Sequence, residues 1–381
     1  MDTQQPIFFI SSQDDRTDAR AGTLRLPHGE VNTPMFMPVG TAGTVKAMRH
    51  RTLHSMGYRL ILGNTYHLYL RPGMEVIQSF GGLHGFSSWR HNILTDSGGY
   101  QIFSLAPFRK ITPEGAQFQS HIDGSRHLLT PEGVVDIQRT IGSDIQMALD
   151  VCTGADEGRK TAEDALKTTT DWAIRAKRQW LAARDDGYYG HLFGIIQGNF
   201  FSDLRTEAVD RTLNIGFPGV AIGGLSVGET YEQYRDILFH TASQIPPEYP
   251  RYVMGIGTPE YILTAIEAGI DMFDCVFPTR AGRNGTLFTT QGRINLKNAR
   301  WGHDDSPPDP GIDSFGGDHY SLGYLRHLFK AKEILGPMLA TEHNLRYMKW
   351  LVDESRRAIV EGSFPTFRDS VLQYYPGRNR A

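Results

Sequence analysis

Short apolar runs that end in Gly, Asp or Asn recur along this chain of 381 residues, and stretches with helical character separate them. Such alternation predicts strand and helix units whose strands lie parallel in one sheet. The strand count approaches eight, and no glycine-rich turn follows the first strand, which argues against a doubly wound nucleotide-binding sheet. We therefore predict an α/β fold, a (β/α)8 TIM barrel, as a single domain over residues 1–381. The runs read RLILGN, NILTD, IQMALD, GHLFGIIQG, GVAIGGL, RYVMGIG and DMFDCV.

Turn and loop residues outline the rest of this barrel. The ordered body is predicted to begin near Phe8, and the segment HGEVNTPMFMPVG predicts a β-hairpin followed by the first barrel strand. The Pro-, Gly- and Asp-rich stretch from Trp301 to Gly317 interrupts the alternation and predicts a loop. Residues 297–350 are predicted to form a subdomain inserted after the last strands. Helical character is expected over Glu132–Ile141, Arg159–Arg184 and Ser202–Leu213.

The composition is that of a globular protein, with 40% hydrophobic and 21% charged residues. The formal net charge of -3 argues against a broadly cationic coat but leaves room for a local basic face that binds RNA. Two cysteines, Cys152 and Cys275, are too few for a disulfide framework or a cysteine-rich zinc site. With no signal-peptide pattern and no apolar run near twenty residues, we expect a cytoplasmic protein without membrane contact.

Aspartates stand at the ends of three apolar runs, at Asp96, Asp150 and Asp274. Because the active site of a (β/α)8 barrel lies at the carboxyl ends of its strands, these side chains are expected at one end of the barrel. A single Asp there is about as often a helix cap or turn residue, but three together favour a site. Two carboxylates in one cleft suit a nucleophile and a general acid or base acting at an anomeric carbon. In LTDSGGYQ, Ser97 and the glycines let the backbone approach a ligand, and Tyr100 supplies a flat face.

Two further strand ends offer hydrogen-bonding groups that suit a planar heterocycle. Gln197 lies in the run IIQG, and Gly224 and Leu225 offer peptide groups in AIGGLSVGE. Such groups can match the donor and acceptor edge of a purine, although a lone Gln can also be a buried amide satisfied by backbone. Arg280 and Arg283 follow the third aspartate, where they could hold phosphates; arginines in a loop are otherwise more often solvated.

Long blocks of the chain resemble one family, the tRNA-guanine transglycosylases or queuine tRNA-ribosyltransferases, in the form that bacteria carry. Members insert 7-deazaguanines at the wobble position of tRNAs with GUN anticodons. The likeness runs from about residue 20 to 375, and so many blocks in order make chance implausible. The blocks are TPMFMPVGTAGTVKA, LGNTYHLYLRPG, LTDSGGYQIFSL, IIQGN, AIGGLSVGE, YVMGIGTPE, FDCVFPTRAGRNGTLFT, YLRHLF and EILGPMLATEHNLRYM.

This resemblance implies roles for the strand-end residues. Asp274 looks like the nucleophile that attacks the ribose anomeric carbon and forms a covalent RNA-enzyme intermediate. Asp96 looks like the general acid and base, and two displacements at one carbon give net retention. Tyr100 and Met254 look like the pair that sandwiches the base, and Cys152 falls near its 7-substituent. The substrate-binding set is Ser97, Tyr100, Asp150, Cys152, Gln197, Gly224, Leu225 and Met254.

The largest departure from the family concerns its zinc site. Members carry a C-x-C-x2-C run and a later histidine, and the aligned positions here are Ile312, Ser314, Gly317 and His343. Without thiolates, no compact ligand spacing remains for a tetrahedral zinc ion. We therefore predict no metal and no other cofactor, with His343 as a packed or capping histidine.

The incoming base and the partners stay open. Cys152 and Val227 resemble bacterial members, whereas Val151 and Thr258 depart from them, so the base is either the aminomethyl precursor or queuine itself. A homodimer is expected by analogy with related bacterial enzymes. Two other functions compete: a non-catalytic tRNA-binding subunit of a heteromeric transglycosylase, and an unrelated barrel hydrolase acting on sugars or nucleosides. Retention of all three aspartates argues against the first, and the second would not require the base-binding set.

Overall fold

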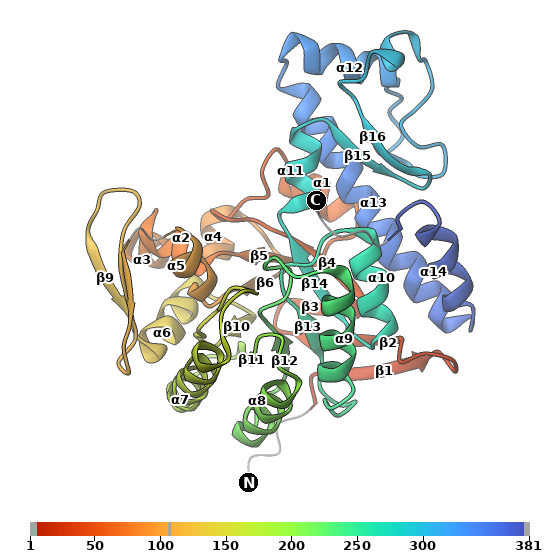
Figure 1. The fold of residues 1–381 in the computed structure, drawn as a ribbon. Coiled ribbons are helices and arrows are strands. Elements are labelled where there is room, and N and C mark those ends of the chain that lie inside the picture. The colour runs from red at the N-terminus through yellow and green to blue at the C-terminus, as the bar shows by residue number, and fades with distance from the viewer. Residues whose placement is uncertain (1–5, 106–107, 377–381) are drawn as a thin grey trace.

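Eight short parallel strands form one barrel in the computed structural model, which describes residues 6–105 and 108–376. Their order around the sheet is β4-β14-β13-β12-β11-β10-β6-β5. A parallel bridge between Val39 and Leu62, with the Gly40 N–H donating to the Leu62 carbonyl at 2.7 Å, closes the ring. The predicted (β/α)8 barrel is confirmed (Figure 1). The strands are β4 (Met35–Pro38), β5 (Leu60–Gly63), β6 (Asn92–Thr95), β10 (Ile145–Met147), β11 (His191–Ile196), β12 (Val220–Ile222), β13 (Arg251–Val253) and β14 (Met272–Cys275).

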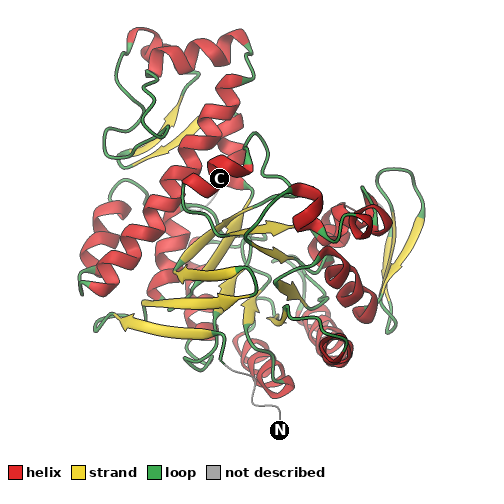
Figure 2. Ribbon diagram, turned by 180° about the vertical axis from the view of Figure 1, so that it is seen from behind, coloured by secondary structure: helices red, strands yellow, loops and turns green. Residues whose placement is uncertain are grey.

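Helices cover the outside of this barrel (Figure 2). Local sequence sets both ends of one of these helices, α6. Thr130 caps its start by accepting a hydrogen bond from the Gly133 N–H at 3.0 Å, and Gly142 ends it in the left-handed conformation. All three helices expected from the sequence are confirmed to within two residues. None of the helices in the described ranges is long and apolar enough to cross a membrane. The helices are α1 (His50–Ser55), α2 (Thr65–Leu70), α3 (Met74–Ser79), α4 (Leu83–Ser87), α5 (Gly99–Leu105), α6 (Pro131–Ile141), α7 (Arg159–Asp185), α8 (Ser202–Ile215), α9 (Tyr231–Ala242), α10 (Pro259–Glu267), α11 (Phe277–Arg283), α13 (Leu335–Val360) and α14 (Phe364–Leu372).

An antiparallel sheet near the amino terminus packs against the barrel interior. Its side chains Phe8, Leu24 and Val31 share one buried cluster with Phe193 and Tyr252 of the barrel strands. The cluster fills the barrel, so a ligand site must lie at a strand end rather than in a central pore. The hairpin predicted here is confirmed, whereas the pairing of a third strand before it was not predicted, because that strand is half polar and mostly exposed. The strands are β1 (Phe8–Gln13), β2 (Arg20–Leu26) and β3 (Gly29–Thr33).

A buried ion pair joins this amino-terminal sheet to the barrel. On β2, Arg20 donates Nε to Oδ1 of Asp271 at 3.0 Å and Nη2 to Oδ2 at 2.6 Å, and both side chains are almost fully buried. Oδ2 also accepts the backbone N–H of Arg251 at 2.7 Å. Burial raises the pKa of Asp271, although the charge of Arg20 opposes that rise. The pair therefore fixes where β2 meets the starts of β13 and β14.

After β14 the chain adds elements that stand to one side of the barrel (Figure 1). They share a buried cluster of their own, which includes Leu287, Phe315, Leu325 and Leu339. The loop predicted from Trp301 to Gly317 is irregular apart from one short 3-10 helix. Whether residues 297–350 form a separate subdomain stays a prediction, and the outermost residues of the predicted domain, 1–5 and 377–381, lie outside the described residues. The added elements are β15 (Thr286–Thr289), β16 (Gly292–Asn295), η1 (Ala299–His303) and α12 (Leu322–Ala331).

A second small antiparallel sheet, between α5 and α6, projects from the barrel and was not predicted (Figure 1). Its strands are short and largely exposed, so they carry no apolar run from which a strand could be inferred. They are β7 (Arg109–Ile111), β8 (Ala116–Gln119) and β9 (Arg126–Leu129).

Replacing Asp271 by Asn should lower the free energy of unfolding by about 3–5 kcal/mol, because it leaves the Arg20 guanidinium buried without a counter-charge. Urea denaturation measures this difference. Glu30→Gln is the matched control, since Glu30 and Arg25 form an exposed pair and its removal should leave stability nearly unchanged. Similar small effects of both substitutions would show that the buried pair does not anchor the sheet.

Candidate active site

A cavity of about 280 Å3 lies at the carboxyl ends of the barrel strands, and every one of the eight strands contributes a residue to its wall at or just beyond its end. The structure brings together all the residues predicted for the site except Arg283, which does not line the cavity. The predicted residues in the wall are Asp96, Ser97, Tyr100, Asp150, Cys152, Gln197, Gly224, Leu225, Met254, Asp274 and Arg280.

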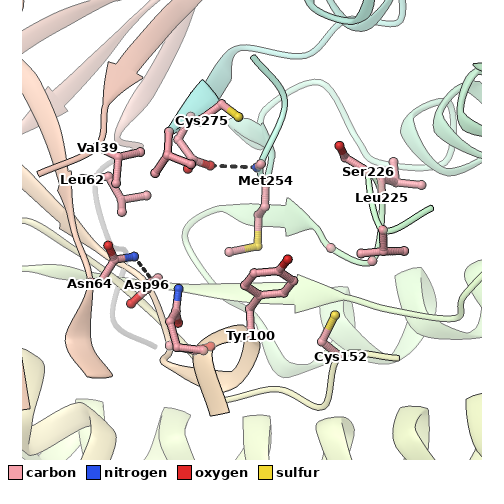
Figure 3. A pocket seen from close by; sticks show the side chains of 18 of the residues that line it. Val39, Leu62, Asn64, Asp96, Tyr100, Cys152, Leu225, Ser226, Met254 and Cys275 are labelled. Carbon is pink, nitrogen blue, oxygen red and sulfur yellow. Dashed lines mark hydrogen bonds between the residues drawn. The ribbon is translucent and has the colours of Figure 1, made fainter. Parts of the chain in front are cut away.

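Asp96 follows β6 directly and is buried. Its Oδ2 accepts a hydrogen bond from the Asn64 side-chain amide at 2.6 Å (Figure 3), and its Oδ1 accepts the Thr65 backbone N–H at 2.8 Å. Burial raises the pKa of Asp96 to about 6, with the charge of Asp274 adding to the rise and the two hydrogen bonds opposing it. A carboxyl group with a pKa of about 6 can both donate and accept a proton near neutral pH.

Asp274 lies on β14, on another part of the cavity wall. Its Oδ1 accepts two hydrogen bonds, from the Tyr252 hydroxyl at 2.5 Å and from the Gly255 backbone N–H at 2.9 Å. Burial raises the pKa of Asp274, and these two hydrogen bonds counteract the rise by stabilising the charged form. Because both bonds use Oδ1, Oδ2 accepts no hydrogen bond from the described residues and is open to a ligand.

Asp150 links two other strand ends. Its Oδ1 accepts the Ser97 hydroxyl at 2.7 Å, and its Oδ2 accepts the Gln197 amide at 2.7 Å. Burial raises the pKa of Asp150, and these two bonds oppose that rise. Each carboxylate oxygen can accept a further hydrogen bond from a ligand. Asp150 and the Gln197 amide together therefore offer both acceptors and donors to the cavity.

Two glycines allow these groups to pack closely. A Cβ at Gly99 would lie 2.7 Å from Oδ1 of Asp150, and a Cβ at Gly224 would lie 2.7 Å from Oε1 of Gln197. Gly224 also has a φ of +68°, which favours glycine. Any larger side chain at either position would displace the groups beside it.

Tyr100 and Met254 point toward one another across the cavity, and Cys152 lies beside Tyr100 (Figure 3). A ring and a thioether on opposite walls suit a flat aromatic ligand placed between them. Burial raises the pKa of the Cys152 thiol to about 12, so this cysteine is a neutral packing group at pH 7 and not a nucleophile. Leu225 and Ser226 complete the wall next to it.

The two arginines predicted to bind RNA both lie on α11, immediately after Asp274 and its strand. Arg280 reaches the cavity wall, whereas Arg283 does not. Burial and the charge of Arg280 lower the pKa of Arg283, and its buried Nη1 has no partner among the described residues. Neither arginine forms an ion pair with a carboxylate in the part of the chain that the structure describes, so two adjacent cations give this edge of the cavity a positive charge that suits a phosphate.

The residues aligned with the family's zinc ligands do not fit a metal. His343 is fully buried, with Nδ1 2.9 Å from the Ser314 hydroxyl and Nε2 2.6 Å from the Phe288 carbonyl. Burial lowers the pKa of His343 to about 4, so the ring is neutral, with Nε2 as donor and Nδ1 as acceptor. Ile312 packs against the main apolar core instead. Both nitrogens of this histidine are therefore engaged by protein groups.

One other cluster of the described residues has ligand atoms close enough for a metal: His28, His84 and Asp144. The two rings stack with centroids 3.9 Å apart and 20° between their planes, so their lone pairs run side by side instead of converging. Nε2 of His84 also lies 2.9 Å from the His91 carbonyl. The hydrogen bond to Asp144, 2.6 Å long, raises the pKa of His28. The cluster therefore satisfies a buried carboxylate.

Several residues that shape this site were not singled out from the sequence. Asn64 ends the apolar run RLILGN, which was a usable signal. Tyr252 lies inside an apolar run, and only the fold shows that its hydroxyl reaches Asp274. Thr65 and Gly255 act through backbone N–H groups, which any residue except proline carries.

The raised pKa of Asp96 predicts a pH-dependent effect of Asp96→Asn. The wild type loses stability as pH rises from about 4 to about 6, because the folded protein resists ionisation of this carboxyl group while the unfolded chain does not. The variant lacks that loss. Its free energy of unfolding, relative to that of the wild type, should therefore rise by about 3 kcal/mol between pH 4 and pH 7. Urea unfolding of both proteins across this range is the measurement, and a pH-independent difference would contradict the assignment.

Comparison with known proteins places the chain in a family. A family model described as queuine tRNA-ribosyltransferase matches residues 14–377. The chain is 50% identical to the queuine tRNA-ribosyltransferase of Borrelia hermsii over 373 residues, covering 98% of this chain and 99% of that protein. It is 49% identical to that of Treponema denticola over 378 residues, covering 99% and 100%. With the enzyme of that name from Solidesulfovibrio magneticus it shares 50% identity over 359 residues, 94% and 95% of the two chains. These matches confirm the resemblance seen in the motif blocks, and the chain belongs to the queuine tRNA-ribosyltransferase family.

Proposed function

We propose that this protein is a tRNA-guanine transglycosylase, which exchanges the wobble guanine of tRNAs with GUN anticodons for a 7-deazaguanine. One observation carries the proposal: two carboxylates, the buried Asp96 and the half-buried Asp274, share a cavity with a group of purine-matching residues centred on Asp150. Full-length similarity to proteins named queuine tRNA-ribosyltransferase supports tRNA as the substrate.

In the first displacement, Oδ2 of Asp274 attacks C1′ of the wobble nucleotide. A C1′–O bond forms, the C1′–N9 bond breaks, and its electron pair goes to the departing guanine. Asp96, with a pKa of about 6, supplies the proton that leaves with the base. The product of this step is a covalent ester between the tRNA and the enzyme.

The second displacement reverses these events with a different base. The incoming 7-deazaguanine gives its N9 proton to Asp96, and N9 attacks the same C1′ from the vacated face. The bond between C1′ and Asp274 breaks, which regenerates the carboxylate. Two inversions at one carbon give net retention.

Recognition of the base rests on groups that are already in place. The Asp150 carboxylate suits the N–H donors of a guanine edge, and the Gln197 amide and the Gly224 peptide suit its carbonyl. Tyr100 and Met254 would cover the two faces of the ring. Arg280 at the rim would contact the RNA backbone, with Arg283 behind it.

The non-catalytic subunit is the weaker reading. A chain that only bound tRNA would need neither the Asp96 environment nor the two hydrogen bonds that hold Asp274. A barrel hydrolase of unrelated origin is ruled out by the family match.

We also propose that the chain folds without the family's structural zinc. The hydrogen bonds of His343 to Ser314 and Phe288 occupy the nitrogens that a zinc ion would need. The apolar cluster around Phe315 and Leu325 supplies packing where members of the family hold a metal. No step of the reaction passes through a metal in this proposal.

We propose that the protein forms a homodimer and that it is located in the cytoplasm. Exposed apolar and aromatic side chains, among them Tyr324 and Ile334, lie on and after α12, and the Tyr320 and Tyr324 rings stack 5.8 Å apart. Such a surface suits burial against a second copy. A tRNA substrate and two free, buried cysteines are consistent with the cytoplasm.

Asp274→Asn should reduce base exchange by at least about 10³-fold, because the amide keeps the shape and the acceptor oxygen but cannot form the ester. The measurement is incorporation of radiolabelled guanine into unmodified tRNA with a GUN anticodon. Asp236→Asn, a change at an exposed position on α9, is the matched control and should keep wild-type activity. Undiminished exchange by Asp274→Asn would overturn the nucleophile assignment.

Purified protein should contain well below one zinc per chain and should keep its melting temperature in EDTA, because no thiolate holds the metal. Elemental analysis and thermal unfolding give both results. The variant with Ile312→Cys, Ser314→Cys and Gly317→Cys is the positive control, since it restores the family's ligand pattern beside His343. One tightly held zinc in the unaltered chain would refute the proposal.

A further inference from the structure

A fully buried arginine lies behind the base-binding wall. Arg205 belongs to α8 and is 0% exposed. None of the ion pairs found in the described ranges includes it, and it donates instead to three backbone carbonyls. Nε bonds the Asn199 carbonyl at 2.7 Å, and Nη1 bonds the carbonyls of Ile196 at 3.1 Å and Gly223 at 2.8 Å. Burying a guanidinium carries a large desolvation penalty, so packing alone does not explain an arginine at this position.

These carbonyls belong to the ends of two neighbouring barrel strands. Ile196 is the last residue of β11 and precedes Gln197, and Gly223 follows β12 and precedes Gly224. In a trans peptide the C=O and the next N–H point in opposite directions. Holding the Gly223 carbonyl on Arg205 therefore turns the Gly224 N–H away from α8, on the side of the peptide that lines the cavity.

Asn199 extends the contact to a third strand end. Its carbonyl is held by Arg205, and its side-chain amide donates to Thr153 Oγ1 at 3.1 Å and to the Gly154 carbonyl at 2.9 Å. Residues 153 and 154 continue the loop that carries Asp150 and Cys152. Arg205 and Asn199 together thus connect the loops after β10, β11 and β12, which hold the three groups proposed to read the base.

Arg205 stays a cation in this setting. Burial lowers its pKa to about 10, which still leaves the guanidinium charged at neutral pH. Its Nη2 has no hydrogen-bond partner among the described residues and lies 3.4 Å from the place that a Cβ at Gly224 would occupy. The cation is therefore next to the base-binding peptide without lining the cavity itself.

We propose that Arg205, assisted by Asn199, is a positioning residue for base recognition: it fixes the Gly223–Gly224 and Ile196–Gln197 peptides so that their donors face the purine. This inference rests on the function proposed above. Under this inference, Arg205 affects binding of the free base and not binding of the tRNA. The contacts proposed for the tRNA lie at α11, on another part of the rim.

Steady-state exchange kinetics test this role, with KM for radiolabelled guanine measured at saturating tRNA and KM for tRNA at saturating guanine. Arg205→Met should raise KM for guanine by about ten-fold or more, because three carbonyls lose the hydrogen bond from Arg205, while KM for tRNA stays near the wild-type value. Arg205→Lys should recover part of the loss, since one ammonium can replace some of the bonds. Arg211→Met, on the exposed part of the same helix, is the matched control and should change neither constant.

Asn199→Gly is the second variant, chosen because Asn199 has a φ of +53°, which glycine adopts freely, so the chain should fold even if Arg205→Met does not. It removes the side-chain link to the loop after β10, together with the local hydrogen bond from the Phe200 N–H to Asn199 Oδ1, and should raise KM for guanine several-fold. An unchanged KM for guanine in these variants, or an equal rise in both constants, overturns the positioning role and leaves the proposed function intact. Absence of exchange by the wild type would instead overturn the proposed function, and this role with it.

Discussion

The proposed chemistry depends on three carboxylates at the strand ends that neutral donors hold in place. Asp96, Asp150 and Asp274 take no part in the ion pairs found among the described residues. Each one accepts hydrogen bonds from amide, hydroxyl or backbone N–H groups. A cation in contact would stabilise the charged forms and would weaken both a nucleophile and a base. Neutral donors fix the geometry while burial keeps the pKa values raised, so the carboxylates remain reactive near neutral pH.

The packing of the barrel offsets the destabilisation that comes from placing these carboxylates away from water without a cation. Its interior is a packed apolar cluster anchored to the amino-terminal sheet through the ion pair of Arg20 and Asp271, so the strand starts are rigid. The polar groups lie at the strand ends, where most loops contribute only a few side chains to the cavity. In the role proposed for it, Arg205 is a buried cation that orients the Gly223–Gly224 peptide, which has no side chain that could do so.

The sequence was sufficient to predict the barrel, and most of the residues predicted for the site line one cavity. The three strand-terminal aspartates stood out because they occur together at the ends of apolar runs, and the motif blocks placed the chain in its family. Asn64 and Tyr252 were not singled out, because their importance comes from the carboxylates that they contact across the barrel. The projecting sheet around β8 was missed because its strands are short and their few buried apolar residues form no run. The partners of His343 likewise depend on distant segments, Ser314 and Phe288, that only folding brings together.

The covalent intermediate is the central claim, and mapping its attachment site tests it most directly. Wild-type protein would be incubated with unmodified tRNA bearing a GUN anticodon, denatured, digested with protease and nuclease, and analysed by mass spectrometry. The account predicts a ribonucleotide remnant, lacking its base, on the peptide that contains Asp274. A remnant on any other residue, or turnover of guanine without an adduct under conditions that trap esters, would contradict it.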